Sequence, residues 1–178
     1  PGITAHNNMA LFSYSQGVRR ALLRTSTPVP GGVNGTASYF ASLSTGLAGP
    51  LLNNNGQIVF NATTARSDSG LVNGGGLWVT DLQGTRLAPI SVTGMRVDPD
   101  DSNAPGCIAV PLSSSTGRTF FLTDDGTVLF YALLDGCLGS QHKAFLVSKP
   151  VTSGGRTLKT VFIMSRQAPD APEGAHIT

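Results

Sequence analysis

A short segment of polar turn residues followed by an apolar run occurs three times in the sequence: AHNNMALF (5–12), NNNGQIVF (53–60) and TDDGTVLF (123–130). Asn55-Gly56 and Asp125-Gly126 are pairs that favour a type I′ turn, in which both central residues have positive φ. Asn8 takes the glycine position in the first copy, and asparagine is the next best residue for that conformation. Branched and aromatic residues after each turn are typical of a strand. We therefore predict tight turns with positive φ at Asn8, Gly56 and Gly126.

The three copies recur with other features in register. Each copy ends on a phenylalanine, at Phe12, Phe60 and Phe130, with spacings of 48 and 70 residues. A second apolar strand follows each copy, and each unit carries a Pro/Gly stretch, PVPGG, APG or APEG. Periods of about 40–50 residues with many turns suggest propeller blades or related arrays. The pattern predicts repeats near 3–36, 37–106 and 107–174, with the three phenylalanines at equivalent buried sites.

The composition favours strands over helices. Charged residues make up only 12% of the 178 residues, with a single glutamate and three lysines, whereas there are 22 glycines and 11 prolines. Glutamate and lysine are the usual helix formers on solvent faces. Strand patterns lie near 9–14, 18–24, 37–43, 57–63, 76–81, 85–92, 107–112, 118–122, 127–133, 143–148 and 158–164. We expect an all-β, antiparallel fold of three blade-like repeats, with a β-sandwich or β-solenoid as the alternative. One domain covers 1–166, and 167–178 is a Pro-rich tail or a link to a further unit.

Charge and cysteine content limit the partners and the compartment. A net charge of +2 is too small to indicate nucleic-acid binding. No apolar run approaches the length of about 18–20 residues that a membrane span needs. Cys107 and Cys137 in a Ser/Asn/Gly-rich chain predict one disulfide and an oxidising compartment, with two buried thiols as the alternative.

Two groups of residues could bind a ligand. Asp98, Asp100 and Asp101 place several oxygen ligands in one loop, which is the ligand type that calcium prefers. The spacing does not match an EF-hand, so a solvated acidic loop is the alternative. We expect Trp78 to be a core residue. Alternatively, Trp78 and Tyr131 could form a platform on which a sugar stacks. The sequence has no nucleophile elbow or phosphate-binding loop.

The segments 52–60 (LNNNGQIVF), 76–79 (GLWV) and 84–88 (GTRLA) resemble bacterial tandem repeats with the signature Asn-x-x-Gly-x-x-Ala-Phe. The resemblance covers most of 3–174 and is clearest over 51–88, while Ala5 and Thr123 replace the leading asparagine in the outer copies. Those repeats occur in secreted proteins with assorted C-terminal surface anchors. The resemblance implies a propeller-like fold and an extracellular or cell-surface location, and it brings no catalytic residues.

The expected function is therefore a secreted or cell-surface structural module that acts through self-assembly or surface binding. A carbohydrate-binding module is the first alternative, and an enzyme whose pocket is built by loops 65–76 and 97–106 is the second. Three repeats fall short of the four to eight blades that close a propeller. Because unpaired strand edges are rarely tolerated, we expect edge-to-edge pairing with other copies or with further repeats of a longer chain.

Overall fold

The computed structural model describes residues 8–43, 49–112, 119–137, 141–151 and 155–164, and these residues form strands and no helix. The first sheet contains β1 (Ala10–Ser15) and β2 (Val18–Arg24). The second contains β3 (Ser38–Leu43), β4 (Leu51–Leu52), β5 (Gln57–Arg66), β6 (Val72–Asp81) and β7 (Ala88–Val92). The third contains β8 (Ile108–Pro111), β9 (Phe120–Leu122), β10 (Val128–Asp135), β11 (His142–Pro150) and β12 (Arg156–Ile163). The predicted all-β, antiparallel class is confirmed.

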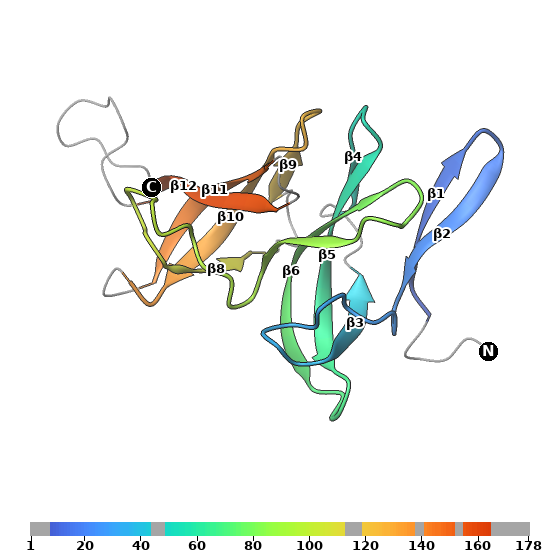
Figure 1. Ribbon diagram of the computed structural model, residues 1–178, viewed down its shortest axis with the longest axis horizontal. Coiled ribbons are helices and arrows are strands. Elements are labelled where there is room, and N and C mark those ends of the chain that lie inside the picture. Colours follow the sequence, from blue (N-terminus) through green and yellow to red (C-terminus); the bar gives the residue numbers. More distant parts are fainter. Residues whose placement is uncertain (1–7, 44–48, 113–118, 138–140, 152–154, 165–178) are drawn as a thin grey trace.

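The three sheets lie next to one another in chain order (Figure 1), with the β3–β7 sheet between the other two. The strands of each sheet come from one of the three segments that the sequence pattern delimits, 3–36, 37–106 and 107–174. The described strands do not close into a barrel or a ring. Of the described strands, only the two-residue β4 was absent from the predicted set, and the predicted tail at 167–178 lies outside the described residues.

The second and third sheets have the same topology. The strand order is β3-β5-β6-β7 in one and β8-β10-β11-β12 in the other, and the short strands β4 and β9 pair with β5 and β10. The register also agrees, because Val59 pairs with Val79 where Leu129 pairs with Val147. A β-bulge interrupts the last strand pair of both sheets at the same point. The two sheets are therefore equivalent units, strand by strand.

Both faces of the middle sheet are buried. Val59 belongs to a core that the β3–β7 sheet shares with the β8–β12 sheet. The next residue, Phe60, belongs to a second core that includes Leu23 from the β1–β2 hairpin. Alternate residues of a strand point to opposite faces, so a strand covered on both sides reads as a nearly continuous apolar run. This explains why Ile58, Val59 and Phe60 are all buried.

The three equivalent phenylalanines do not share one environment. Phe130 is fully buried and Phe60 is 3% exposed, as predicted, but Phe12 is 50% exposed. Phe130 packs in the core shared with the preceding sheet, and so does Phe60. Phe12 lines a pocket at the surface instead, together with Leu52 and Leu82. The prediction of a buried Phe12 is therefore wrong for a physical reason.

Among the described residues, no helix is of the length and apolarity required to cross a membrane.

Candidate functional site

The two glycine turns of the repeated segment have one geometry. Gly56 N donates to Asn53 O, and Gly126 N donates to Thr123 O, at 3.1 Å in both turns. Gly56 and Gly126 have φ of 74° and 81°, which confirms the predicted positive φ at these two positions. Asn55 and Asp125 are not among the described residues with positive φ. The turns are therefore type I with a left-handed glycine that forms a bulge, and the type I′ prediction is wrong.

The turn predicted at Asn8 involves His6 and Asn7, which lie outside the described residues. Asn8 itself is exposed and lies two residues before β1.

The two glycine turns bind each other across the boundary between the sheets. Asn53 Nδ2 donates to Thr123 O at 2.9 Å, and Asn55 Nδ2 donates to Asp124 O at 2.6 Å. Asn54 donates from its main-chain N to Asp124 Oδ1 at 3.0 Å and from Nδ2 to Asp124 Oδ2 at 2.8 Å. The Asn54 donors hold the pKa of Asp124 below its usual value, with the charge of Asp125 opposing them. The repeated segment thus forms the contact that fixes one sheet against the next.

A cleft of about 410 Å³ lies beside the paired turns. Its lining includes Asp81, Arg86, Asp125 and Arg156. The Asp125 carboxylate accepts hydrogen bonds from both Thr123 Oγ1 and Thr127 Oγ1, and Asp81 accepts from Thr85. Each of these two carboxylates is therefore held by hydroxyl groups of its own turn.

Arg156 connects two segments in the wall of this cleft. Its guanidinium donates to Gly126 O at 2.6 Å, to Ser148 O at 2.9 Å and to Ser148 Oγ at 2.9 Å. Burial lowers the pKa of Arg156, and the nearby charge of Asp125 opposes that effect. Nε and Nη2 of this arginine are therefore bound to groups of the protein, which is the arrangement of a structural residue.

Hydrogen bonds and an ion pair join the acidic loop at 98–101 to β12. Leu158 N donates to Asp98 Oδ2 at 3.1 Å, and Lys159 Nζ lies 2.8 Å from Asp100 Oδ2. The buried Asp101 accepts from Thr160 N with one oxygen and, with the other, from the amides of the two residues Asn103 and Ala104. Carboxylates that accept from main-chain amides do not converge on an ion, and the described residues contain no group of three metal-ligating side chains. Asp98, Asp100 and Asp101 therefore connect this loop to β12, and a calcium site at these residues stays a prediction.

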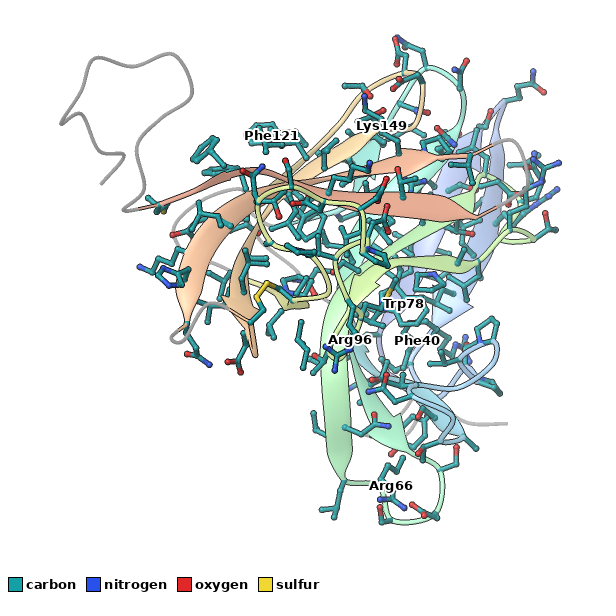
Figure 2. The ribbon with its side chains drawn as sticks, turned by 60° about the vertical axis from the view of Figure 1, so that its left-hand side comes forward. Phe40, Arg66, Trp78, Arg96, Phe121 and Lys149 are labelled. Carbon is teal, nitrogen blue, oxygen red and sulfur yellow. A yellow bond between two sulfur atoms is a disulfide. The ribbon has the colours of Figure 1, made fainter. Side chains whose placement is uncertain are left out.

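Trp78 and Tyr131 lie in different parts of the molecule. Trp78 is 1% exposed and meets Phe40 edge-on, with ring centroids 5.0 Å apart (Figure 2). A buried indole cannot stack on a sugar at the surface, so the platform that includes Trp78 is a wrong expectation. Tyr131 instead lies on the far side of the β8–β12 sheet, where its ring packs 5.2 Å from that of Phe145.

Cys107 and Cys137 form the predicted disulfide, which joins the segment before β8 to the loop after β10. Their Cα atoms are 5.2 Å apart.

The loops proposed for an enzyme pocket lie apart. Arg66 and Asp68 form an exposed ion pair at the tip of the β5–β6 hairpin. Figure 2 shows Arg66 at that tip, well away from Arg96, which directly precedes the loop at 97–106. These two loops therefore do not face a common site.

The largest feature that the sequence analysis missed is an apolar surface on the β8–β12 sheet. We define the outer face as five positions of this sheet: Phe121, Leu129, Phe145, Val147 and Val161. Phe121 and Val161 are 50% and 43% exposed, and the other three are half-buried. Figure 2 shows the Phe121 ring at the surface of the molecule. The sequences of β10–β12 do indicate this face, because apolar residues occupy both sets of alternating positions, those that point to the core and those that point away from it.

The comparisons with known proteins place the chain in a family without a known activity. Residues 1–105, which contain the β1–β2 and β3–β7 sheets, match a family of unknown function, DUF7453. No curated protein and no solved structure matches the chain. Because the match covers more than half of the sequence, the chain belongs to the DUF7453 family of unknown function.

Proposed function

We propose that this protein is a non-catalytic structural and interaction module of the cell surface or extracellular space, which acts by assembling with copies of its own fold. The observation that carries the proposal is the equivalence of the β3–β7 and β8–β12 sheets in strand order, register and bulge position. A fold built of equivalent stacked units can be extended by further units, as in other repeat architectures. The resemblance of its turns to Asn-x-x-Gly-x-x-Ala-Phe repeats of secreted bacterial proteins supports the same role.

The location follows from the disulfide together with that resemblance. A disulfide persists in oxidising compartments and is rare in the cytosol. The Cys107–Cys137 bridge therefore favours a secreted or surface-displayed protein. We also propose that the sheets are blade-like units. A propeller would need a larger number of such sheets.

Sedimentation velocity on the oxidised chain tests the assembly role. The proposal predicts that the sedimentation coefficient rises with protein concentration. A single monomeric species at every concentration would contradict assembly between copies.

A second candidate is carbohydrate binding by the aromatic side chains of the β8–β12 sheet. Tyr131, Phe145 and Phe162 form a row in which successive ring centroids lie 5.2 and 4.9 Å apart. Aromatic rings at a surface can stack on the apolar face of a sugar. A glycan array with the wild-type chain and the Phe145→Ala variant separates the two candidates. Glycan binding that the substitution abolishes would favour this second role.

A further inference from the structure

We propose that the cleft beside the paired turns is a binding site for a neutral saccharide. The inference goes beyond the proposed assembly role and does not depend on it, because both walls of the cleft belong to one copy of the chain. The site is also distinct from the aromatic row on the β8–β12 sheet, since Tyr131, Phe145 and Phe162 do not line the cleft.

The cleft has the position and the size of a small-molecule site. Its walls come from both large sheets, because Gln57 begins β5, Asp81 ends β6 and Arg156 begins β12. Small-molecule sites often lie where two domains meet, and this cleft lies at the comparable boundary between two sheets. Its volume of about 410 Å³ falls within the range of about 300–1,000 Å³ that such sites occupy.

Three side chains of the cleft offer hydrogen-bond donors that the described part of the chain does not use. Arg156 donates to oxygen atoms of the protein with Nε and Nη2, which leaves Nη1. Gln57 Oε1 accepts from Asn53 at 2.7 Å, whereas no described group accepts from Gln57 Nε2. The Arg86 side chain is exposed and has no partner among the described residues. These donors are available to a ligand that carries acceptor atoms.

The same cleft contains acceptors with remaining capacity. The Asp124 carboxylate accepts two hydrogen bonds from Asn54, and the Asp125 carboxylate accepts three from Thr123 and Thr127. These hydrogen bonds lower the pKa of both aspartates, so both groups are ionised at neutral pH. Because an ionised carboxylate has about four lone-pair sites, each of them can also accept from a ligand.

The charges around the cleft favour a neutral ligand. Two of the lining residues are positively charged and three are negatively charged, namely Arg86, Arg156, Asp81, Asp124 and Asp125. A strongly charged ligand would therefore meet groups of its own sign, whichever sign it carried. A hydroxyl group both donates and accepts, so a ligand rich in hydroxyl groups can pair with the donors and with the carboxylates.

The remaining lining suits the C–H groups of a sugar ring. Val79, Ala88, Pro150 and Val151 contribute apolar surface beside the polar groups, and no aromatic residue is part of the described lining. Recognition in this cleft would therefore rest on hydrogen bonds from several fixed side chains, with apolar contacts beside them. A neutral saccharide carries both kinds of group on one small molecule.

A glycan array printed with neutral and acidic oligosaccharides tests the site with matched variants. Arg86→Ala removes one unused donor group, and Gln57→Glu replaces the Nε2 donor by an acceptor in a side chain of nearly the same shape. Arg19→Ala is the control, because Arg19 is an exposed arginine of β2 outside the cleft. Thermal melts verify that each variant folds.

The wild-type chain should bind neutral glycans on the array. Titration calorimetry with a glycan that binds should show the dissociation constant raised at least about tenfold by Arg86→Ala and by Gln57→Glu, because each removes a hydrogen bond to the ligand. Arg19→Ala should leave the constant unchanged. Phe145→Ala, which alters the aromatic row, should leave it unchanged as well.

Several results would overturn the site. These are the absence of binding to any neutral glycan, binding confined to acidic glycans, and dissociation constants that both cleft variants leave unchanged. Glycan binding that Phe145→Ala abolishes and the cleft variants retain would assign the sugar to the aromatic row instead. Sedimentation measures assembly independently of all these results, so the saccharide site and the assembly role can fail separately.

Discussion

Asn54 and Asp124 lie 70 residues apart in the sequence, and two hydrogen bonds of 3.0 and 2.8 Å join them where the turns of the two large sheets meet. Both residues come from the same place in the repeated turn segment. A motif that would otherwise be a local hairpin signal therefore also supplies the contact between successive sheets. The contact is polar and lies at the rim, while the apolar residues behind it form the shared core.

This contact predicts a characteristic response to acid. The pKa of Asp124 is lowered in the folded protein by its hydrogen bonds from Asn54. An aspartate whose folded pKa lies below its unfolded value of about 4 adds stability above that pH, and this stability is lost as the pH falls through the folded pKa. The melting temperature of Asp124→Asn should therefore be below that of the wild type at neutral pH, and the gap should narrow below about pH 4.

Asp135→Asn is the matched control for Asp124→Asn, because Asp135 accepts from Gly136 and Gln141, close to it in the chain. Thermal melts across the acid range measure all three proteins. A gap for Asp124→Asn that is absent at neutral pH, or that widens in acid, would contradict the role given to the Asn54 contact.

The close approach of β6 and β7 predicts that Gly76 tolerates no side chain. A Cβ atom at Gly76 would lie 2.2 Å from Ser91 O and 2.6 Å from Val92 Cα, both of them backbone atoms. Gly76→Ala should cost at least about 1–3 kcal/mol of unfolding free energy, because the strands would have to separate. At the neighbouring Gly75, the nearest atom would be Ala62 O at 3.4 Å. Urea unfolding should show Gly75→Ala losing under about 1 kcal/mol, and equal losses would contradict this reading of the sheet.

Two phenylalanines that are equivalent in sequence should differ in their effect on stability. Phe130→Ala removes a fully buried ring and should cost about 3–5 kcal/mol. Phe12→Ala removes a ring that is half exposed and should cost less than about 1 kcal/mol in the monomer. Urea unfolding at a concentration low enough to prevent association measures both. Comparable losses would mean that Phe12 is covered in the isolated chain.

Much of the fold could be predicted from the sequence because its signals are local. Branched residues after Asn-Gly and Asp-Gly pairs located the strands around Ile58 and Val128, since turn chemistry and side-chain alternation act over a few residues. The strand β4 was missed because two residues are too few to display a period.

The contacts of the candidate site could not be predicted, because they join segments that are distant in the sequence. The sequence identifies Asp101 as part of an acidic loop, but its hydrogen-bond partners include the amide of Thr160, which lies near it only in the folded chain. Phe12 carries the same pattern as Phe60, yet it is 50% exposed and Phe60 is 3% exposed, because the burial of each ring depends on which distant residues pack against it. Alternation within a strand assigns a residue to a face, and it does not say what covers that face.

The disulfide predicts a measurable dependence on redox state. The bridge between Cys107 and Cys137 spans 30 residues, for which the chain-entropy description gives a stabilisation of about 3–4 kcal/mol. A double substitution to alanine should lower the unfolding free energy by that amount in urea titrations. Intact mass after alkylation should show no free thiol in the oxidised chain and two after reduction. Two free thiols in protein purified without reductant would count against an extracellular location.

Photo-cross-linking from position 161 tests the central claim, that the protein assembles with other copies of its own fold. Val161 is replaced by a photoreactive benzoylphenylalanine, which its 43% exposure should accommodate without loss of folding. The intermolecular products are then digested and sequenced by mass spectrometry. The account predicts intermolecular products in which position 161 is joined to a peptide of another copy. The absence of any intermolecular product would contradict it.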